Sequence, residues 1–153
     1  MKRPKIGDVI EIPTSKGLAY AQYAHKTQMH GNLLRVFNHL YDSRPDDLAR
    51  IMAGAHDYWQ FVPLSYGLNK QIFFVVENIS VPLEAQVFPT LRYPNAWLSG
   101  KAESWTLWDG EKEWRIDGEL TPEQRKLWFI NVATPSYLVG HIEEQWIPEM
   151  DPR

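Results

Sequence analysis

The sequence predicts an α+β fold made mainly of β-strands, with a strongly bent, mostly antiparallel sheet or partial barrel and one principal helix. Three observations lead to this prediction. Eleven prolines and nine glycines interrupt short apolar runs, a pattern typical of short strands joined by turns. Aromatic residues make up 13% of the chain, and such large side chains need an extensive surface to pack against. One segment, residues 43–54, shows the spacing of an amphipathic helix.

Length and composition limit the class of protein. The chain has 153 residues, of which 44% are hydrophobic and 23% charged, so we expect one globular domain over residues 1–153 rather than a disordered or collagen-like chain. The absence of cysteine excludes disulfides, thiolate metal sites and cysteine nucleophiles. The N-terminal segment carries Asp8 and Glu11 where a signal peptide would be apolar, and no run reaches transmembrane length. We therefore expect a cytoplasmic protein without a membrane partner.

The N-terminal quarter reads as three strands of one sheet. Residues 6–12 form the first strand, which opens with a Gly-Asp turn and ends at a proline. A turn at residues 14–17 leads into a second strand at residues 18–25, and the two strands are predicted to form a hairpin. Residues 32–37 are expected to be the third strand.

Two segments carry the start signals of a helix. In residues 43–54, Ser43 is the expected N-cap, a proline lies in the first turn, and Gly54 is the expected stop. Residues 121–124 have the form of a capping box, Ser/Thr-x-x-Glu/Gln, and are predicted to open a short helical turn. The apolar stripe of the first helix consists of Leu48, Ile51 and Met52.

The middle and end of the chain alternate between apolar runs and breaks. Residues 60–64 and 71–76 read as strands, and the second is continuously apolar, which favours a central strand buried on both faces. A single helical turn is expected at residues 81–86, and residues 88–100 are predicted to be irregular because of their prolines. Residues 137–142 are predicted to form the last strand.

The clearest hairpin spans residues 104–116. Its turn contains Asp109-Gly110, and either a two-residue or a four-residue loop fits, so the register stays open. Both registers preserve the faces, with Trp105 and Trp114 predicted to be buried and Trp108 exposed on the opposite, polar face. The apolar face consists of Trp105, Leu107, Trp114 and Ile116.

The titratable residues show no catalytic or metal-binding pattern. The five histidines fall on separate segments without the spacing of metal ligands, and the chain has no nucleophile elbow, phosphate-binding glycine loop or dinucleotide fingerprint. We therefore predict no catalytic residue, no metal and no cofactor. Asp46 and Asp47 are explained by helix capping, whereas the role of the pair Glu143 and Glu144 stays open.

Charge is unevenly distributed along the chain. The net charge of −3 argues against nucleic acid as a partner. Residues 1–100 carry 10 basic and 8 acidic side chains, net +2, whereas residues 101–153 carry 6 basic and 11 acidic side chains, net −5. A protein partner is therefore expected to bind the acidic C-terminal third, with an exposed tryptophan as anchor and acidic side chains as steering charges. The predicted contact residues are Trp108, Glu113, Glu143 and Glu144.

Four strings together resemble the immunity protein 26 family: residues 7–13, 16–23, 44–47 and 105–116. The likeness is strongest over residues 5–37, where a Gly-Asp strand ends at a proline and is followed by a turn and a tyrosine-containing strand. Membership implies a protein of a bacterial polymorphic toxin system that binds a cognate toxin domain and neutralises it. That function requires no enzymatic activity.

A function of a different class fits the same strands. A small β-barrel enzyme or ligand-binding protein would use a pocket bordered by Tyr20, Tyr23, His25 and Arg35. A deep cleft with converging polar groups would favour this alternative, whereas a flat acidic face with exposed aromatic side chains would favour the toxin-binding protein.

Overall fold

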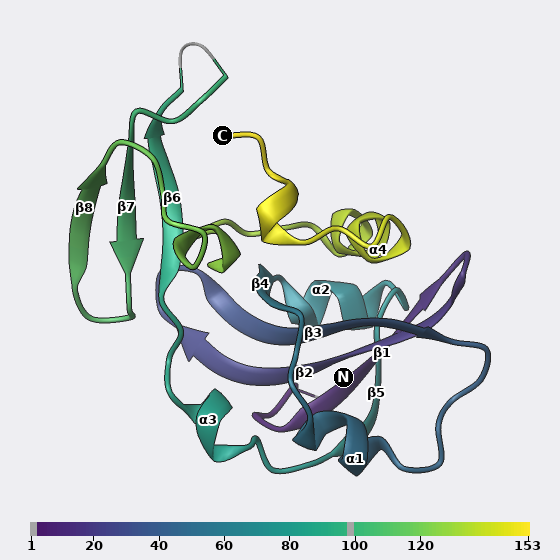
Figure 1. The fold of residues 1–153 in the computed structure, drawn as a ribbon. Helices are drawn as coiled ribbons and strands as arrows, with labels where there is room; N and C mark the ends of the chain where they lie inside the picture. The colour runs from purple at the N-terminus through teal and green to yellow at the C-terminus, as the bar shows by residue number, and fades with distance from the viewer. Residues whose placement is uncertain (1–2, 98–99) are drawn as a thin grey trace.

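The computed structural model describes residues 3–97 and 100–153 and contains two antiparallel sheets (Figure 1). The larger sheet has the strand order β4-β3-β2-β1-β5 and is strongly curled (Figure 1). The smaller sheet has the order β6-β7-β8. Strands of the larger sheet are β1 (Asp8–Thr14), β2 (Gly17–Thr27), β3 (Gly31–Tyr41), β4 (Tyr58–Val62) and β5 (Phe74–Asn78). Those of the smaller sheet are β6 (Leu91–Ala96), β7 (Ser104–Trp108) and β8 (Glu113–Asp117).

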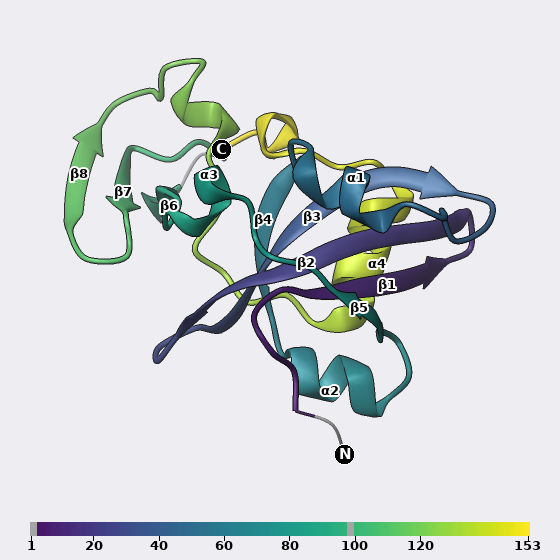
Figure 2. The same cartoon turned by 90° about the horizontal axis from the view of Figure 1, so that it is seen from below.

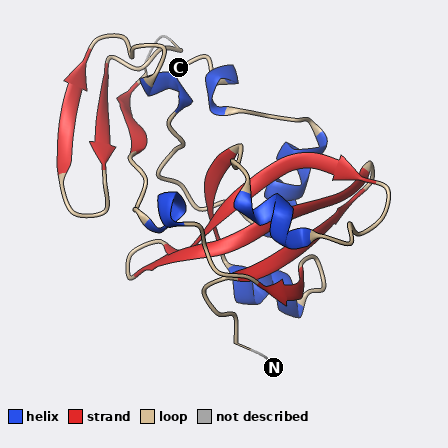
Figure 3. Ribbon diagram, turned by 60° about the horizontal axis from the view of Figure 1, so that its bottom comes forward, coloured by secondary structure: helices blue, strands red, loops and turns tan. Residues whose placement is uncertain are grey.

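Short helices complete this mainly β fold (Figure 3). Helices α1 and α4 pack on opposite faces of the larger sheet (Figure 2), because Leu48 of α1 and Leu138 of α4 belong to separate apolar clusters on either side of it. No helix of the described residues is both long and apolar enough to cross a membrane. The helices are α1 (Leu48–Ala53), α2 (Leu64–Asn69), α3 (Leu83–Gln86) and α4 (Pro135–Glu143), with 3-10 turns at Gln124–Lys126 and Pro148–Met150.

The N-terminal hairpin confirms the sequence prediction. β1 and β2 pair antiparallel around a turn at residues 15–16, and β3 extends the sheet on the other side of β2. Gly7 has a φ of 95°, and a Cβ there would lie 2.7 Å from the carbonyl oxygen of Ile79. The turn that opens β1 therefore requires glycine.

Helix α1 is shorter than predicted. It begins at Leu48, and the N-cap is Asp47, whose Oδ1 accepts a hydrogen bond from Arg50 N at 3.1 Å, so the expected cap at Ser43 is wrong. Arg44 instead forms an ion pair with Glu11 at 2.7 Å, and a residue before a proline is disfavoured in a helix. Gly54 ends the helix as predicted.

Two predictions for the middle of the chain are wrong, one about a central strand and one about an irregular segment. β5 is an edge strand that pairs only with β1, and Phe74 is exposed, so residues 71–76 are not a central strand buried on both faces. Its neighbour Phe73 leaves the sheet and is buried against α2, where Gly67 accepts its backbone N–H at 3.1 Å. Residues 91–96, expected to be irregular, form the edge strand β6, a position that tolerates Pro94.

The segment at residues 137–142 is helical and not a strand. Thr134 caps α4 by accepting a hydrogen bond from Tyr137 N at 3.1 Å, and Pro135 occupies the first turn. Leu138 and Ile142 are fully buried, four residues apart on one face of the helix. The run of apolar residues thus has a helical period, and the cap and proline before it are the signals that identify the helix.

The hairpin of β7 and β8 has the longer of the two predicted loops. Trp105 pairs with Ile116 and Leu107 with Trp114. Trp105 is 1% exposed, but Trp114 is 41% exposed, so the prediction that both are buried is wrong for Trp114. β8 is the outer strand of its sheet, and Trp114 therefore packs against fewer elements than Trp105 does.

The capping box at residues 121–124 forms as predicted. Thr121 N donates to Gln124 Oε1 at 2.9 Å, and Gln124 N donates to Thr121 Oγ1 at 3.2 Å. The box opens the 3-10 turn at Gln124–Lys126.

Candidate functional site

An open groove of about 870 Å³ lies where the turn between β2 and β3 approaches the turn between β7 and β8. Two of its side chains are strongly exposed apolar groups, Met29 at 83% and Val87 at 70%. Trp108 and Phe88 also line it and are half-buried. The groove therefore presents exposed apolar side chains to solvent among polar and charged ones, which is the composition of an interaction site.

Aromatic packing holds the walls of this groove in place. The ring of Trp108 meets those of Phe88 and His30 edge-on, with centroids 5.2 and 5.4 Å apart. Gly110, in the β7–β8 turn, has a φ of 97°, and a Cβ there would lie 2.8 Å from Phe88 Cδ1. The turn can therefore approach Phe88 this closely only because residue 110 is glycine.

The β7–β8 turn is also held by its own aspartate. Asp109 Oδ1 accepts backbone hydrogen bonds from Glu111 at 3.0 Å and Lys112 at 2.8 Å. These bonds stabilise the charged carboxylate and lower the pKa of Asp109. Asp109 and Glu111 thus bring carboxylates to the lining of the groove, to which Lys26 contributes an ammonium group.

The structure brings together two of the four predicted contact residues. Trp108 and Glu113 are directly paired across β7 and β8. Trp108 is half-buried rather than exposed, because Phe88 and His30 cover one side of its ring. It nevertheless lines the groove, so its place in a candidate site remains while its predicted exposure is wrong.

Glu143 and Glu144 lie elsewhere, at the end of α4, on the side of the molecule opposite to β8 (Figures 1 and 2). Glu143 Oε2 accepts hydrogen bonds from Ser15 N at 2.7 Å and from Ser15 Oγ, which lower the pKa of its carboxylate. Lys16 Nζ donates to the carbonyl oxygen of Glu143 at 3.1 Å. Glu143 therefore attaches α4 to the β1–β2 turn. Because Glu113 is on β8, the three glutamates Glu113, Glu143 and Glu144 do not form one acidic surface.

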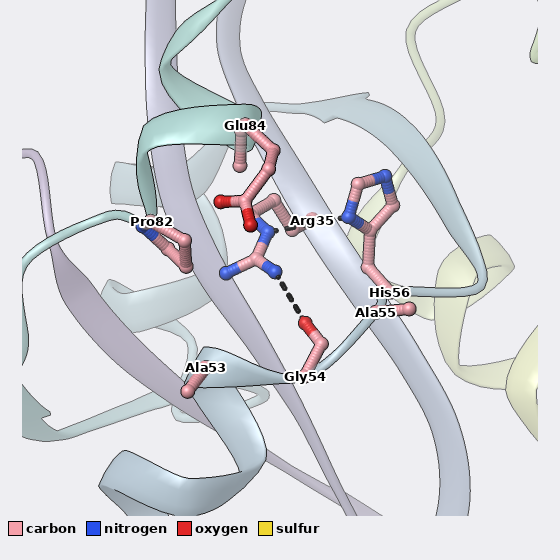
Figure 4. Close-up of a pocket in the computed structure, with 8 residues that line it drawn as sticks. Arg35, Ala53, Gly54, Ala55, His56, Pro82 and Glu84 are labelled. Carbon is pink, nitrogen blue, oxygen red and sulfur yellow. Dashed lines mark hydrogen bonds between the residues drawn. The ribbon is translucent and has the colours of Figure 1, made fainter.

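A second candidate site is a cavity of about 260 Å³ between α3 and the segment that follows α1 (Figure 4). Arg35 of β3 borders it and is only 2% exposed. Its guanidinium donates to Gln22 Oε1 at 2.7 Å, to the carbonyl oxygens of Met52 and Gly54 at 2.9 Å each, and to His56 Nδ1 at 3.3 Å. A buried cation is thus held rigidly at the wall of a small cavity.

The histidines next to this cavity are neutral. Burial, and then the charge of Arg35, lower the pKa of His56 to about 4. Because Nδ1 of His56 accepts from Arg35, the proton of the neutral ring is on Nε2. His25 Nε2 lies 2.8 Å from the carbonyl oxygen of Ala85 and positions α3, and burial lowers the pKa of this ring as well.

Only part of the predicted pocket assembles. Of the four predicted residues, Arg35 lines the cavity. His25 does not line it but contacts the carbonyl oxygen of Ala85, which does. Tyr20 is in a separate apolar cluster and donates to Glu11 Oε2 at 2.8 Å, and Tyr23 is buried in the main core. The sequence prediction missed His56, which follows α1, and Glu84, which is on α3; only the fold brings these segments to the cavity beside Arg35.

Within residues 3–97 and 100–153, no three His, Asp or Glu side chains gather closely enough to hold a metal ion. Comparison with family models, with curated proteins and with solved structures found no match to this chain. Function therefore has to be inferred from the groove and the cavity.

Proposed function

We propose that this chain is a non-enzymatic immunity protein of a bacterial polymorphic toxin system, which binds and neutralises a cognate toxin domain in the cytoplasm. The observation that carries the proposal is the groove, in which Met29 and Val87 are exposed beside the half-buried ring of Trp108. The resemblance of residues 7–13 and 105–116 to the immunity protein 26 family supports it.

The groove has the makeup of a protein interface. Binding energy concentrates where an aromatic side chain and apolar neighbours lose water together, surrounded by polar groups. Trp108 supplies the aromatic group and Met29 an adaptable apolar one. Because Phe88 and Gly110 hold the turn in place, binding would cost little conformational entropy.

Charge at the groove favours a basic partner. Asp109, Glu111 and Glu113 lie on the β7–β8 hairpin, at the rim of the groove or directly beside it. Complementary charge mainly accelerates association, and its effect weakens with salt. A basic toxin surface would therefore be steered to this hairpin.

The test uses the protein encoded immediately upstream of this chain as the candidate toxin, immobilised for surface plasmon resonance. Met29→Lys places a positive charge in the groove, against a basic partner, and should raise Kd at least tenfold. Leu83→Lys is the matched control, because Leu83 is 79% exposed and does not line the groove. Equal effects of the two variants, or none, would show that the groove is not the binding surface.

A ligand-binding protein or small β-barrel enzyme is the second candidate function. It is favoured by one observation, the buried Arg35 at the wall of a cavity. The pocket predicted from Tyr20, Tyr23, His25 and Arg35 is replaced here by one built from Arg35, His56 and Glu84.

A further inference from the structure

We propose that the Arg35 cavity binds a small zwitterion with the chemistry of a free α-amino acid. Its carboxylate would meet Arg35, its ammonium group would meet Glu84, and a small apolar side chain would lie against Pro82 and Ala85. This goes beyond toxin binding, because the cavity and the groove share no lining residue.

The guanidinium of Arg35 forms no close ion pair among the described residues; the ring of Phe37 lies 5.0 Å from it, and Glu84 acts on its charge from a longer distance. The hydrogen bonds of Arg35 all end on uncharged acceptors, namely backbone carbonyls, a glutamine oxygen and a neutral histidine. Across the described part of the chain, no carboxylate oxygen lies within 4.0 Å of its guanidinium nitrogens. A buried cation without a close counter-ion is unfavourable, and an anion placed beside it offsets the lost hydration.

One donor of the guanidinium is also left over. A guanidinium carries five N–H groups, and Arg35 uses one on Nε, two on Nη1 and one on Nη2. The remaining Nη2–H belongs to a group that borders the cavity. It can donate a charge-assisted hydrogen bond to a carboxylate.

Glu84 supplies the opposite charge. It is exposed on α3, lines the same cavity and forms no ion pair with any described residue. Figure 4 shows its carboxylate over the Arg35 guanidinium, with Pro82 on one side and Gly54 on the other. A lone anion would be repelled by Glu84, whereas a zwitterion satisfies both charges.

The size of the cavity fits the smaller amino acids. A group the size of a water molecule occupies about 30 Å³. A cavity of about 260 Å³ therefore holds roughly eight non-hydrogen atoms, which is the size of valine. The apolar side chains of Pro82 and Ala85, which line the cavity, match a short aliphatic side chain rather than a charged one.

Three matched probes test the proposal by titration of the 15N-labelled protein at pH 7, followed by NMR. L-valine carries both charges, isovalerate lacks the amine, and isobutylamine lacks the carboxylate. Valine should shift the signals of the Arg35 Nε–H and of the amides of Gly54, Ala55 and His56, and each analogue should bind at least roughly tenfold more weakly. No localised shift with valine, or isovalerate binding as tightly as valine, would overturn the proposal.

Two variants assign the contacts without altering the buried arginine. Glu84→Gln removes the exposed charge and should weaken valine about tenfold without weakening isovalerate. Glu84→Lys should abolish valine binding by repelling its ammonium group, whereas Glu77→Lys, at an exposed position outside the cavity, should leave it unchanged. Valine binding that persists in Glu84→Lys, or is unaffected by Glu84→Gln, contradicts the assigned site. Spectra of the unliganded variants verify that each remains folded, and none of these results depends on the toxin.

Discussion

Acidification from pH 7 to pH 5 should destabilise the protein through His56. This ring is half-buried, accepts the Nε–H of Arg35 and lies edge-on to Trp59, with centroids 4.5 Å apart. Protonation would remove the acceptor and place a second positive charge against the guanidinium of Arg35. The folded protein therefore favours the neutral ring, and its pKa falls to about 4 from the ordinary value of 6.5.

The sign and size of the effect follow from proton linkage. Between pH 6.5 and pH 4 the unfolded chain binds a proton at His56 that the folded chain does not bind. The stability contributed by the neutral ring is thus present above pH 6.5 and is lost as the pH falls, by about 2 kcal/mol at pH 5. His25 and His141, whose pKa values are also lowered by burial, act in the same direction.

Urea unfolding at pH 7 and pH 5 measures the effect. His56→Gln keeps an acceptor for Arg35 but cannot be protonated, so it should reduce the loss of unfolding free energy by about 2 kcal/mol. His39→Gln, the same replacement at an exposed histidine, should retain the full loss. Should His56→Gln lose as much stability as the unmodified protein between these pH values, the neutral, arginine-bound ring would be refuted.

Further substitutions test the core, the turn and the charged residues. Trp105→Ala should lower the free energy of unfolding in urea by roughly 3–5 kcal/mol. Trp114→Ala should lower it much less, because its ring is 41% exposed. Equal losses for the two variants would contradict the finding that only Trp105 is fully buried. Gly110→Ala should cost roughly 1–3 kcal/mol, seen as a lower Tm, because its φ is positive and Phe88 leaves no room for a Cβ. Glu143→Lys should lower Tm by breaking the bonds to Ser15 but leave k_on for the toxin unchanged. Glu113→Lys, beside the groove, should slow k_on and flatten its salt dependence without lowering Tm; slower association for Glu143→Lys but not Glu113→Lys would reverse the assigned surface.

Local sequence signals determined the elements whose causes are themselves local. The β1–β2 hairpin, the helical turn of α3 and the stop of α1 at Gly54 all follow from turn residues and caps. The side-chain period of two likewise identified which residues share a face of the β7–β8 hairpin. The capping signal at Thr134-Pro135 is equally local, and it identifies α4 as a helix where the apolar run at residues 137–142 alone predicts a strand.

Tertiary structure alone decided what covers each face. An apolar run such as residues 71–76 does not encode whether it becomes a central or an edge strand, because that depends on which strands pair beside it. Trp105 and Trp114 share a face by parity, but only Trp105 is on the middle strand and fully buried. The Arg35 cavity joins three segments distant in sequence, and burial, which removes the hydration of the guanidinium and lowers the pKa of His56, exists only once those segments pack together.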